Sequence, residues 1–412
     1  MTDRHDGPRD VTAPGNSAPP ASQARWAALA DCPSPPAPAG RAAGLANRIL
    51  VYLRPGKVAT VLPHLDTGHS GLILAGASPG KGLQELEGTG PGVPRLIDPA
   101  CHEKYTATCD APFLLPKGQL HAPSLDDVLD DQLRAGVTVA LTPTGYIPAG
   151  RTDILRAAAR QFSQLGRDDV IFVAPLDVSL VDRAYIKTTT AILASLDNPI
   201  ALILGRQFDP LDQSKRIIPN LRELAATVPL MPVRTDFNGF DLAAHGAFAA
   251  AIGTGGSLRH AVDPQERPMA FRRKGEPADP APSVLFPELA SWFKGSKIAK
   301  LFGARPHAAP RCYCPVCQGQ RLTRFLKRED QDDAIAHGVE VWSGWAADLL
   351  DQPTVRDRAV YWRNLCCGAV ATHAVFRMQL KIMDARTLQP QGPLGVWATQ
   401  PAWPAESTPA TV

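Results

Sequence analysis

Three cysteines within six residues are the strongest chemical signal in this chain. Cys312, Cys314 and Cys317 lie in the stretch RCYCPVC, at the spacing Cys-x-Cys-x-x-Cys. This spacing lets three thiolates converge on one ion, and a structural Zn²⁺ takes four such ligands in a tetrahedron. Downstream, His337 and His373 are both available as the fourth ligand. Three neighbouring thiols cannot all pair as disulfides, and free ones would be open to oxidation, so we expect a zinc site rather than a loop of free cysteines.

A local excess of basic residues surrounds these cysteines. The chain has 412 residues, 44% of them hydrophobic, and a net charge of only +3. Residues 271–328, however, contain twelve Lys and Arg against three Asp and Glu. A basic block of this kind favours a polyanion partner, most simply nucleic acid. The alternative is a solvated face that happens to be basic.

The eight cysteines indicate a reducing compartment. The N-terminus is polar and rich in proline, without the apolar segment of a secretory signal, and no apolar run approaches the length of a membrane span. We therefore expect a cytoplasmic protein with no membrane partner, in which cysteines serve a metal rather than disulfides.

The N-terminal part changes character near residue 45. Residues 1–44 are rich in Pro, Ala, Ser and Gly, and their composition predicts a disordered tail. Short apolar runs then predict strands at 49–53, 58–62 and 72–75. The glycine-rich stretch 80–92 predicts a loop.

A regular alternation of strands and helices follows. Short apolar runs alternate with amphipathic segments at intervals of roughly 30 residues, which is typical of βα units with a parallel sheet. No Gly-x-Gly-x-x-Gly follows a first strand, which lowers the case for a dinucleotide-binding fold. We predict an α/β fold, a (β/α)₈ barrel over residues 45–270, with an open doubly wound sheet as the alternative. The predicted helices are 124–134, 153–165, 180–196, 211–226 and 240–245, and the predicted strands are 137–141, 170–174, 200–204, 230–233 and 247–252.

The C-terminal part predicts a separate unit. Residues 271–387 are expected to form a basic, zinc-binding helical subdomain. It would contain an amphipathic piece at 289–302 and two long helices at 334–350 and 355–384. Residues 388–412 are again rich in proline and predict a frayed tail.

Carboxylates at the ends of two predicted strands are candidates for catalysis. Asp98 and Asp236 follow strands, and inward-pointing groups at strand ends of a barrel can share one site. The simpler interpretation is that Asp236 caps the next helix and Asp98 precedes a proline turn. Other polar residues at strand ends include Asp177, Asp209 and Arg234.

A glycine-rich segment follows the last predicted strand. It reads IGTGGSLR, and its backbone N–H groups at Gly253, Gly255 and Gly256 could cradle a phosphate, with Arg259 adding a bidentate contact. The alternative is a tight glycine turn into a helix.

The cysteine motif and the helical histidine together carry a family resemblance. A (β/α)₈ barrel with Cys-x-Cys-x-x-Cys, followed by a helix containing Ile-Ala-His-Gly-Val around His337, resembles the tRNA-guanine transglycosylases. These enzymes exchange guanine for a 7-deazaguanine base, as in queuosine modification of tRNA, and relatives act on DNA. The resemblance implies a structural zinc held by Cys312, Cys314, Cys317 and His337. It also implies pairing of subunits through the zinc region.

The resemblance also implies two carboxylates. The segment around Asp98 loosely matches the place of the family's second aspartate. The family's nucleophile should follow the stretch AHGAF, but Ala249, Ala250 and Ala251 stand there, and alanine cannot attack ribose C1′.

Three functional hypotheses follow from the sequence. The first is a glycosyltransferase of the tRNA-guanine transglycosylase type, with Asp98 and Asp236 as its carboxylates and a structural zinc. The second is a catalytically inactive accessory subunit, in a homodimer or in a heterodimer with a catalytic homologue. The third is a barrel enzyme that acts on a small phosphorylated substrate held by the glycine-rich segment.

Overall fold

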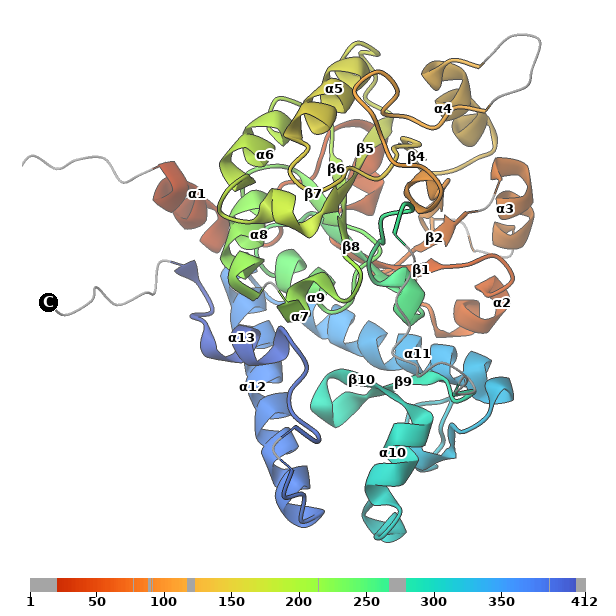
Figure 1. The fold of residues 1–412 in the computed structure, drawn as a ribbon, viewed down its shortest axis with the longest axis vertical. Helices are drawn as coiled ribbons and strands as arrows, with labels where there is room; N and C mark the ends of the chain where they lie inside the picture. The colour runs from red at the N-terminus through yellow and green to blue at the C-terminus, as the bar shows by residue number, and fades with distance from the viewer. Residues whose placement is uncertain are drawn as a thin grey trace, which may run out of the picture.

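The fold was taken from a computed structural model, which describes residues 21–404 apart from 77, 88, 89, 91, 117–122, 214, 267–278 and 385. The predicted tails at 1–20 and 405–412, and the first part of the basic block at 271–278, lie outside the described residues. In Figure 1 the strand-rich part of the chain lies above, and a helical part with one short hairpin lies below.

Eight parallel strands in two sheets form the strand-rich part. One sheet has the order β3-β2-β1-β8 and the other the order β4-β5-β6-β7. This confirms an α/β fold with parallel sheets. The strands are β1 Arg48–Leu53, β2 Leu72–Ala75, β3 Arg95–Asp98, β4 Ala140–Leu141, β5 Val170–Asp177, β6 Ile200–Gly205, β7 Leu230–Pro232 and β8 Ala249–Gly253.

Hydrogen bonds join the outer strands of the two sheets on both sides. Between β3 and the segment that leads into β4, the Thr138 N–H donates to the Arg95 carbonyl at 2.9 Å. Between β7 and β8, the Phe248 N–H donates to the Leu230 carbonyl at 3.0 Å. A further parallel bridge links Thr235 with Ile252.

Alternate residues of the strands pack into two different cores. In β1, Leu50 and Tyr52 belong to one buried cluster, whereas Ile49 and Val51 belong to another. The first cluster draws one or two side chains from each of the eight strands, and the second contains apolar side chains of the surrounding helices. Because successive strand residues point to opposite faces, both faces of the sheets are covered.

Helices lie between successive strands, as the alternation predicts. The Ser124 side chain accepts from the Asp127 N–H, and Asp127 bonds back to the Ser124 N–H, so α4 begins at a capping box. The helices are α2 Val58–Val61, α3 Pro79–Leu86, α4 Leu125–Arg134, α5 Thr152–Ser163, α6 Ile186–Leu193, α7 Pro210–Gln213, α8 Ile218–Ala225 and α9 Asn238–Ala243.

Several predicted elements are corrected by the structure. The predicted strand at 58–62 is the short helix α2, whose buried Val58 and Val61 are spaced for a helix face rather than for a sheet. The predicted loop at 80–92 contains α3. The predicted helix at 211–226 is broken into α7 and α8, and Pro219 lies in the first turn of α8, where proline is tolerated.

The lower part of the molecule is built on a hairpin and two long helices. Its core joins Phe286, Phe293 and Phe302 with Cys312 and Cys317. The predicted piece at 289–302 is in fact a strand followed by a helix. The elements are the antiparallel strands β9 Ser283–Phe286 and β10 Ser291–Lys294, and the helices α10 Gly295–Phe302, α11 Gln331–Leu350 and α12 Val355–Gln379.

The described parts of both predicted tails are ordered. Residues 21–44 contain α1 (Ala21–Ala30), and residues 388–404 contain α13 (Leu394–Thr399). Trp26 and Trp403 are 4% and 0% exposed and meet edge to face at 5.0 Å. The predictions of disorder for residues 21–44 and of fraying for residues 388–404 are therefore wrong, because aromatic side chains at opposite ends of the chain bury one another.

None of the helices in the described part of the chain combines the length and apolar character that a membrane span requires.

Candidate metal centre and strand-end polar clusters

The three cysteines and His337 converge on one point. The Sγ atoms of Cys312, Cys314 and Cys317 each lie 3.5 Å from His337 Nδ1, and all four atoms lie within 4.8 Å of one another. The loop turns tightly because Gln318 and Gly319 adopt left-handed φ angles of 49° and 81°. Three thiolates and an imidazole at this separation could hold one metal ion.

The backbone fixes the orientation of the His337 ring. Its Nε2–H donates to the Leu285 carbonyl of β9 at 2.8 Å, so Nδ1 is left with a free lone pair that faces the sulfurs. The side chain is fully buried in α11. Such a second hydrogen bond orients a metal-binding histidine and fixes its tautomer. Arg324 lies 3.8 Å from Cys317 Sγ, where its charge favours the thiolate.

His373 does not belong to this cluster. Its two ring nitrogens lie against the carbonyls of Leu388 and Leu289, at 3.0 and 3.3 Å. Of the two histidines that the sequence left open, His337 is therefore the one that meets the cysteines. The four ligand atoms form a closed set, which suits a structural ion and leaves no open position for a reacting water.

Asp236 pairs with Asp209, not with Asp98. The two carboxyl groups follow β7 and β6 and share a hydrogen bond. Burial and the neighbouring charge of Asp236 raise the pKa of Asp209 to about 8, and burial also raises the pKa of Asp236. Two carboxyls in contact cannot both ionise readily, so the pair holds one proton near neutral pH.

Arg259 faces this acid pair. Its guanidinium stacks over the Trp292 ring at 3.5 Å, and its Nε donates to the Gly253 carbonyl at 3.2 Å. Burial lowers the pKa of Arg259 to about 10, while Asp236 and Asp209 act in the opposite direction. The arginine is thus turned toward the carboxylates and the aromatic ring.

The glycine-rich segment beside it is shaped by packing. A Cβ on Gly253 would lie 2.0 Å from the Leu258 carbonyl oxygen, so this glycine permits the close turn. Gly255 and Gly256 have no atoms within 4 Å of such a Cβ and remain open.

A small cavity lies against the acid pair. Arg259, Asn238 and both carboxyls line it, and it has about 10 Å³ of room for the centre of a water molecule, enough for a single water. Arg259 Nη2 and Asn238 Oδ1 are buried there without a partner among the described residues. One hydrogen-bonding group in this cavity could therefore satisfy a donor and an acceptor together.

Asp98 belongs to a second polar cluster at the strand ends. It accepts from the Tyr52 hydroxyl at 2.6 Å and from the Ala100 N–H at 2.7 Å. Beside it, Glu103 accepts from both Arg54 and Arg234, and Arg234 also contacts His102 at 2.9 Å. Burial lowers the pKa of His102 to about 4, so this histidine is neutral near pH 7.

Several of these partners escaped the sequence analysis. Asp209 and Arg234 were recognisable as polar residues after strands, but nothing in the sequence couples Asp209 to Asp236 or Arg234 to Glu103. Tyr52 lies inside an apolar strand and gives no polar signal at all.

The alanines of β8 lie where a nucleophile was sought. Ala249 and Ala251 are 1% and 0% exposed and belong to the cluster formed by all eight strands. Ala250 points to the other face, against the helices. Because alanine has no carboxylate, none of these three positions can provide the nucleophile.

Comparison with known proteins gives no family for this chain: no family model matches it, and no curated protein shows significant similarity to it.

Proposed function

We propose that the two sheets close into a (β/α)₈ barrel and that the lower part is a zinc-binding subdomain. The hydrogen bonds from β3 to the segment before β4 and from β7 to Phe248, just before β8, support closure. The single cluster that draws side chains from all eight strands supports it further, because the interior of a small barrel is filled in this way. The Cys₃His set fits Zn²⁺, since thiolates and imidazole are the ligands that this ion prefers.

We propose that the protein is a transglycosylase-like enzyme that exchanges a guanine-type base in tRNA or DNA. The observation that carries this proposal is the Asp209–Asp236 pair at the carboxyl ends of β6 and β7. Base exchange needs one ionised carboxylate as nucleophile and one protonated carboxyl as acid. A pair that shares one proton supplies both forms at neutral pH.

The roles of the two carboxyls follow from their protonation. In the proposed reaction the cavity beside the pair, which has room for one water in this structure, widens to admit the nucleotide. Asp236, as the carboxylate, attacks ribose C1′ while the C1′–N bond breaks, and Asp209 gives its proton to the departing base. The incoming base then attacks C1′, which releases Asp236 and returns a proton to Asp209. Arg259 stabilises the ionised state of the pair throughout.

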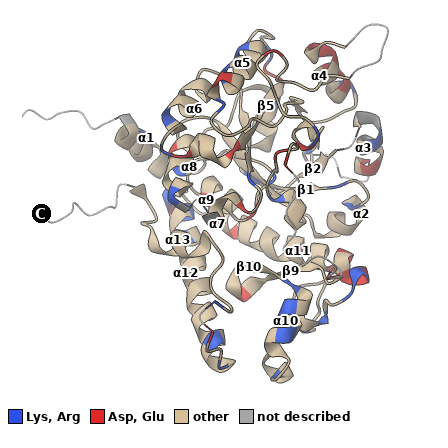
Figure 2. Cartoon of the chain, viewed as in Figure 1, with Lys and Arg blue, Asp and Glu red and all other residues tan. Residues whose placement is uncertain are grey.

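The zinc subdomain provides a surface for nucleic acid in this proposal. Lys294, Lys297 and Lys300 are exposed on β10 and α10, where Figure 2 shows basic residues gathered on the lower part of the molecule. Trp292 of the same hairpin stacks on Arg259, so the subdomain contacts the arginine that faces the acid pair. Zinc would hold this hairpin and α11 together.

The test is base exchange by the purified, zinc-loaded protein. We would incubate it with labelled guanine and either bulk tRNA or duplex DNA and count label in the polymer. Asp236→Asn and Asp209→Asn are each expected to lower incorporation at least about 10²-fold. Asp131→Asn, which changes an exposed carboxylate on α4, serves as the matched control. Undiminished incorporation by Asp236→Asn would overturn the assignment.

An accessory subunit is the second candidate, and the Arg54–Glu103–Arg234 ion pairs favour it. These groups satisfy one another at the strand ends, and Ala249 and Ala251 supply no nucleophile beneath them. This candidate predicts no exchange by the protein alone, but nucleic-acid binding and association with a catalytic homologue. A small phosphorylated substrate gains less support, because Trp292 stacks on the Arg259 guanidinium and Gly253 engages its Nε, which leaves only Nη2 without a partner among the described residues.

A further inference from the structure

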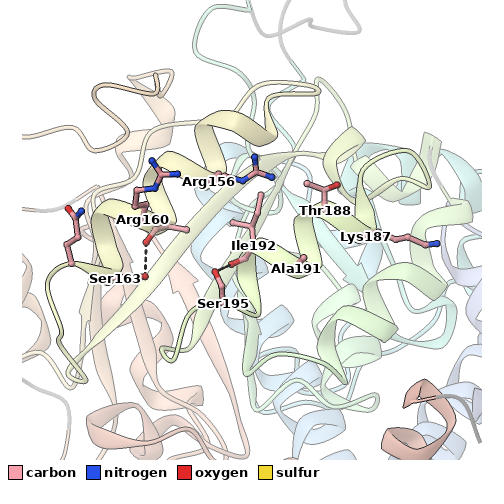
Figure 3. Close-up of a pocket in the computed structure, with 10 residues that line it drawn as sticks. Arg156, Arg160, Ser163, Lys187, Thr188, Ala191, Ile192 and Ser195 are labelled. Carbon is pink, nitrogen blue, oxygen red and sulfur yellow. Dashed lines mark hydrogen bonds between the residues drawn. The ribbon is translucent and has the colours of Figure 1, made fainter.

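A basic groove runs along the outside of the strand-rich part, between α5 and α6. It has a volume of about 810 Å³ and is open to solvent. Ala159, Ala191 and Ile192 form its apolar floor, and Arg156, Arg160 and Lys187 stand around it. Figure 3 shows the two arginines on α5 and the lysine on α6, on either side of this floor.

The three cations of the groove have no acidic neighbour in its lining. No Asp or Glu lines the groove, and within the described residues no ion pair involves Arg156, Arg160 or Lys187. All three side chains are exposed. Their charges are therefore available to a ligand.

The arginines that flank α5, in contrast, do have acidic partners. Arg151, just before α5, pairs with Asp153, and Arg167, after α5, contacts Asp126, Asp130 and Asp169. The arginines at both ends of α5 are thus paired with carboxylates, whereas the cations that line the groove have no carboxylate beside them in its lining. This contrast points to a binding surface rather than to an ordinary solvated face.

The arrangement of the charges indicates the form of the ligand. Arg156 and Arg160 are four residues apart, so they are neighbours on one helix face, about 6 Å along its axis. Lys187 lies on the other wall, in the first turn of α6, where the helix dipole adds positive potential. The cations stand on both walls of an open groove and do not converge on one point, which suits several successive phosphates better than a single one.

The serine hydroxyls at the far end of the groove do not add to its anion contacts. The Ser163 hydroxyl donates to the Ala159 carbonyl at 3.0 Å, and the Ser195 hydroxyl to the Ile192 carbonyl at 2.7 Å. With their protons so used, these serines present acceptors rather than an additional anion site. The apolar floor could pack against sugar rings.

We propose that this groove binds the sugar–phosphate backbone of the nucleic acid at a distance from the acid pair. The inference rests on the proposed function for the identity of the polyanion. Phosphate contacts of this kind position a nucleic acid without reading its sequence, and their strength depends steeply on salt.

The test is the salt dependence of binding to labelled tRNA and to duplex DNA by the full chain. Arg156→Gln/Arg160→Gln is expected to reduce the slope of log K against log salt by about two, because about one counterion is released per phosphate contact. Lys187→Gln should reduce it by about one. The control, Lys81→Gln/Arg134→Gln, removes two exposed charges from α3 and α4 and should leave the slope unchanged.

The outcomes separate this inference from the proposed function. Base exchange by the wild-type protein with an unchanged slope in the groove variants would overturn the groove and keep the function. A reduced salt slope in the groove variants, with no base exchange by the wild-type protein, would support the groove as a binding surface and overturn the proposed function. Absence of binding to either polymer would overturn the groove. Competition by millimolar inorganic phosphate at constant ionic strength would also overturn it, in favour of a single-anion site.

Discussion

The metal cluster and the strand-end clusters are assembled in different ways. Three of the four metal-facing residues lie within six positions of one another, and the fourth is one helix away. The strand-end groups come from far apart in the chain: Arg234 meets Glu103 across 131 residues, and Tyr52 meets Asp98 across 46. The first site is encoded by local spacing, whereas the second exists only through the order of the strands.

The two regions also differ in how their negative charges are neutralised. In the metal cluster, thiolates repel one another unless a cation joins them, so an ion bound there would be part of the local fold. At the strand ends, carboxylates are balanced by arginines or by a shared proton, as in Asp209–Asp236 beside Arg259. Removing the metal should therefore have a large and local effect, whereas changes of pH should act on the strand ends.

Metal removal is expected to have the largest effect. Cys317→Ser, or chelation of the wild-type protein, should release about one ion per chain and unfold the core around Phe286 and Phe302, since metal sites of this type contribute on the order of 10 kcal/mol to folding. Metal analysis and hydrogen exchange would measure both changes. His373→Gln is the matched control, because His373 is buried in the same region but contacts only carbonyls. Unchanged metal content in Cys317→Ser would contradict the assignment.

Asp209→Asn should change the pH dependence of stability. The pKa of Asp209 rises from 3.8 to about 8 on folding, so between these values the folded protein binds more protons than the unfolded chain. Stability should therefore fall as pH rises from about 4 to about 8, by up to about 1.4 kcal/mol per pH unit. The Asn variant should lose this slope and be more stable than the wild type at pH 8.

Urea unfolding at pH 5 and pH 8 would measure this difference. Asp131→Asn, an exposed carboxylate on α4, is the control and should keep the wild-type slope. Parallel profiles for Asp209→Asn and the wild type would mean that the two carboxyls do not share a proton.

Local sequence patterns were sufficient to predict most of the metal cluster but not the Asp209–Asp236 pair. The Cys-x-Cys-x-x-Cys spacing named three of the metal-facing residues, and the choice between His337 and His373 needed the fold, because both lie on long helices. Strand-end position marked Asp209 and Asp236 separately. Their pairing depends on β6 and β7 being neighbours, which no local pattern reports.

The same limit explains the errors in the fold. A short apolar run such as 58–62 fits a strand or a helix, and only packing decides between them. Composition predicted disorder for residues 21–44 and fraying for residues 388–404, but Trp26 and Trp403 pack together from opposite ends of the chain. Long-range contacts of this kind outweigh local composition.

A contact between the strand-rich part and the lower part of the molecule provides the smallest and most specific test. His69 lies before β2, and its Nδ1 and Nε2 are each 2.9 Å from a carboxylate, those of Asp66 and of Asp351 at the end of α11. Burial lowers the pKa of His69, but the hydrogen bonds to Asp66 and Asp351 outweigh it, so the folded pKa lies above the unfolded 6.5. The stabilisation is therefore complete below pH 6.5 and is lost as pH rises through the folded value.

His69→Gln in the Asp209→Asn background should lower the free energy of unfolding at pH 6 by about 1 kcal/mol or less, and not at all well above the folded pKa. Equal losses at both ends of the pH range would show that His69 acts by packing and that no charge interaction joins the strand-rich part to α11 here.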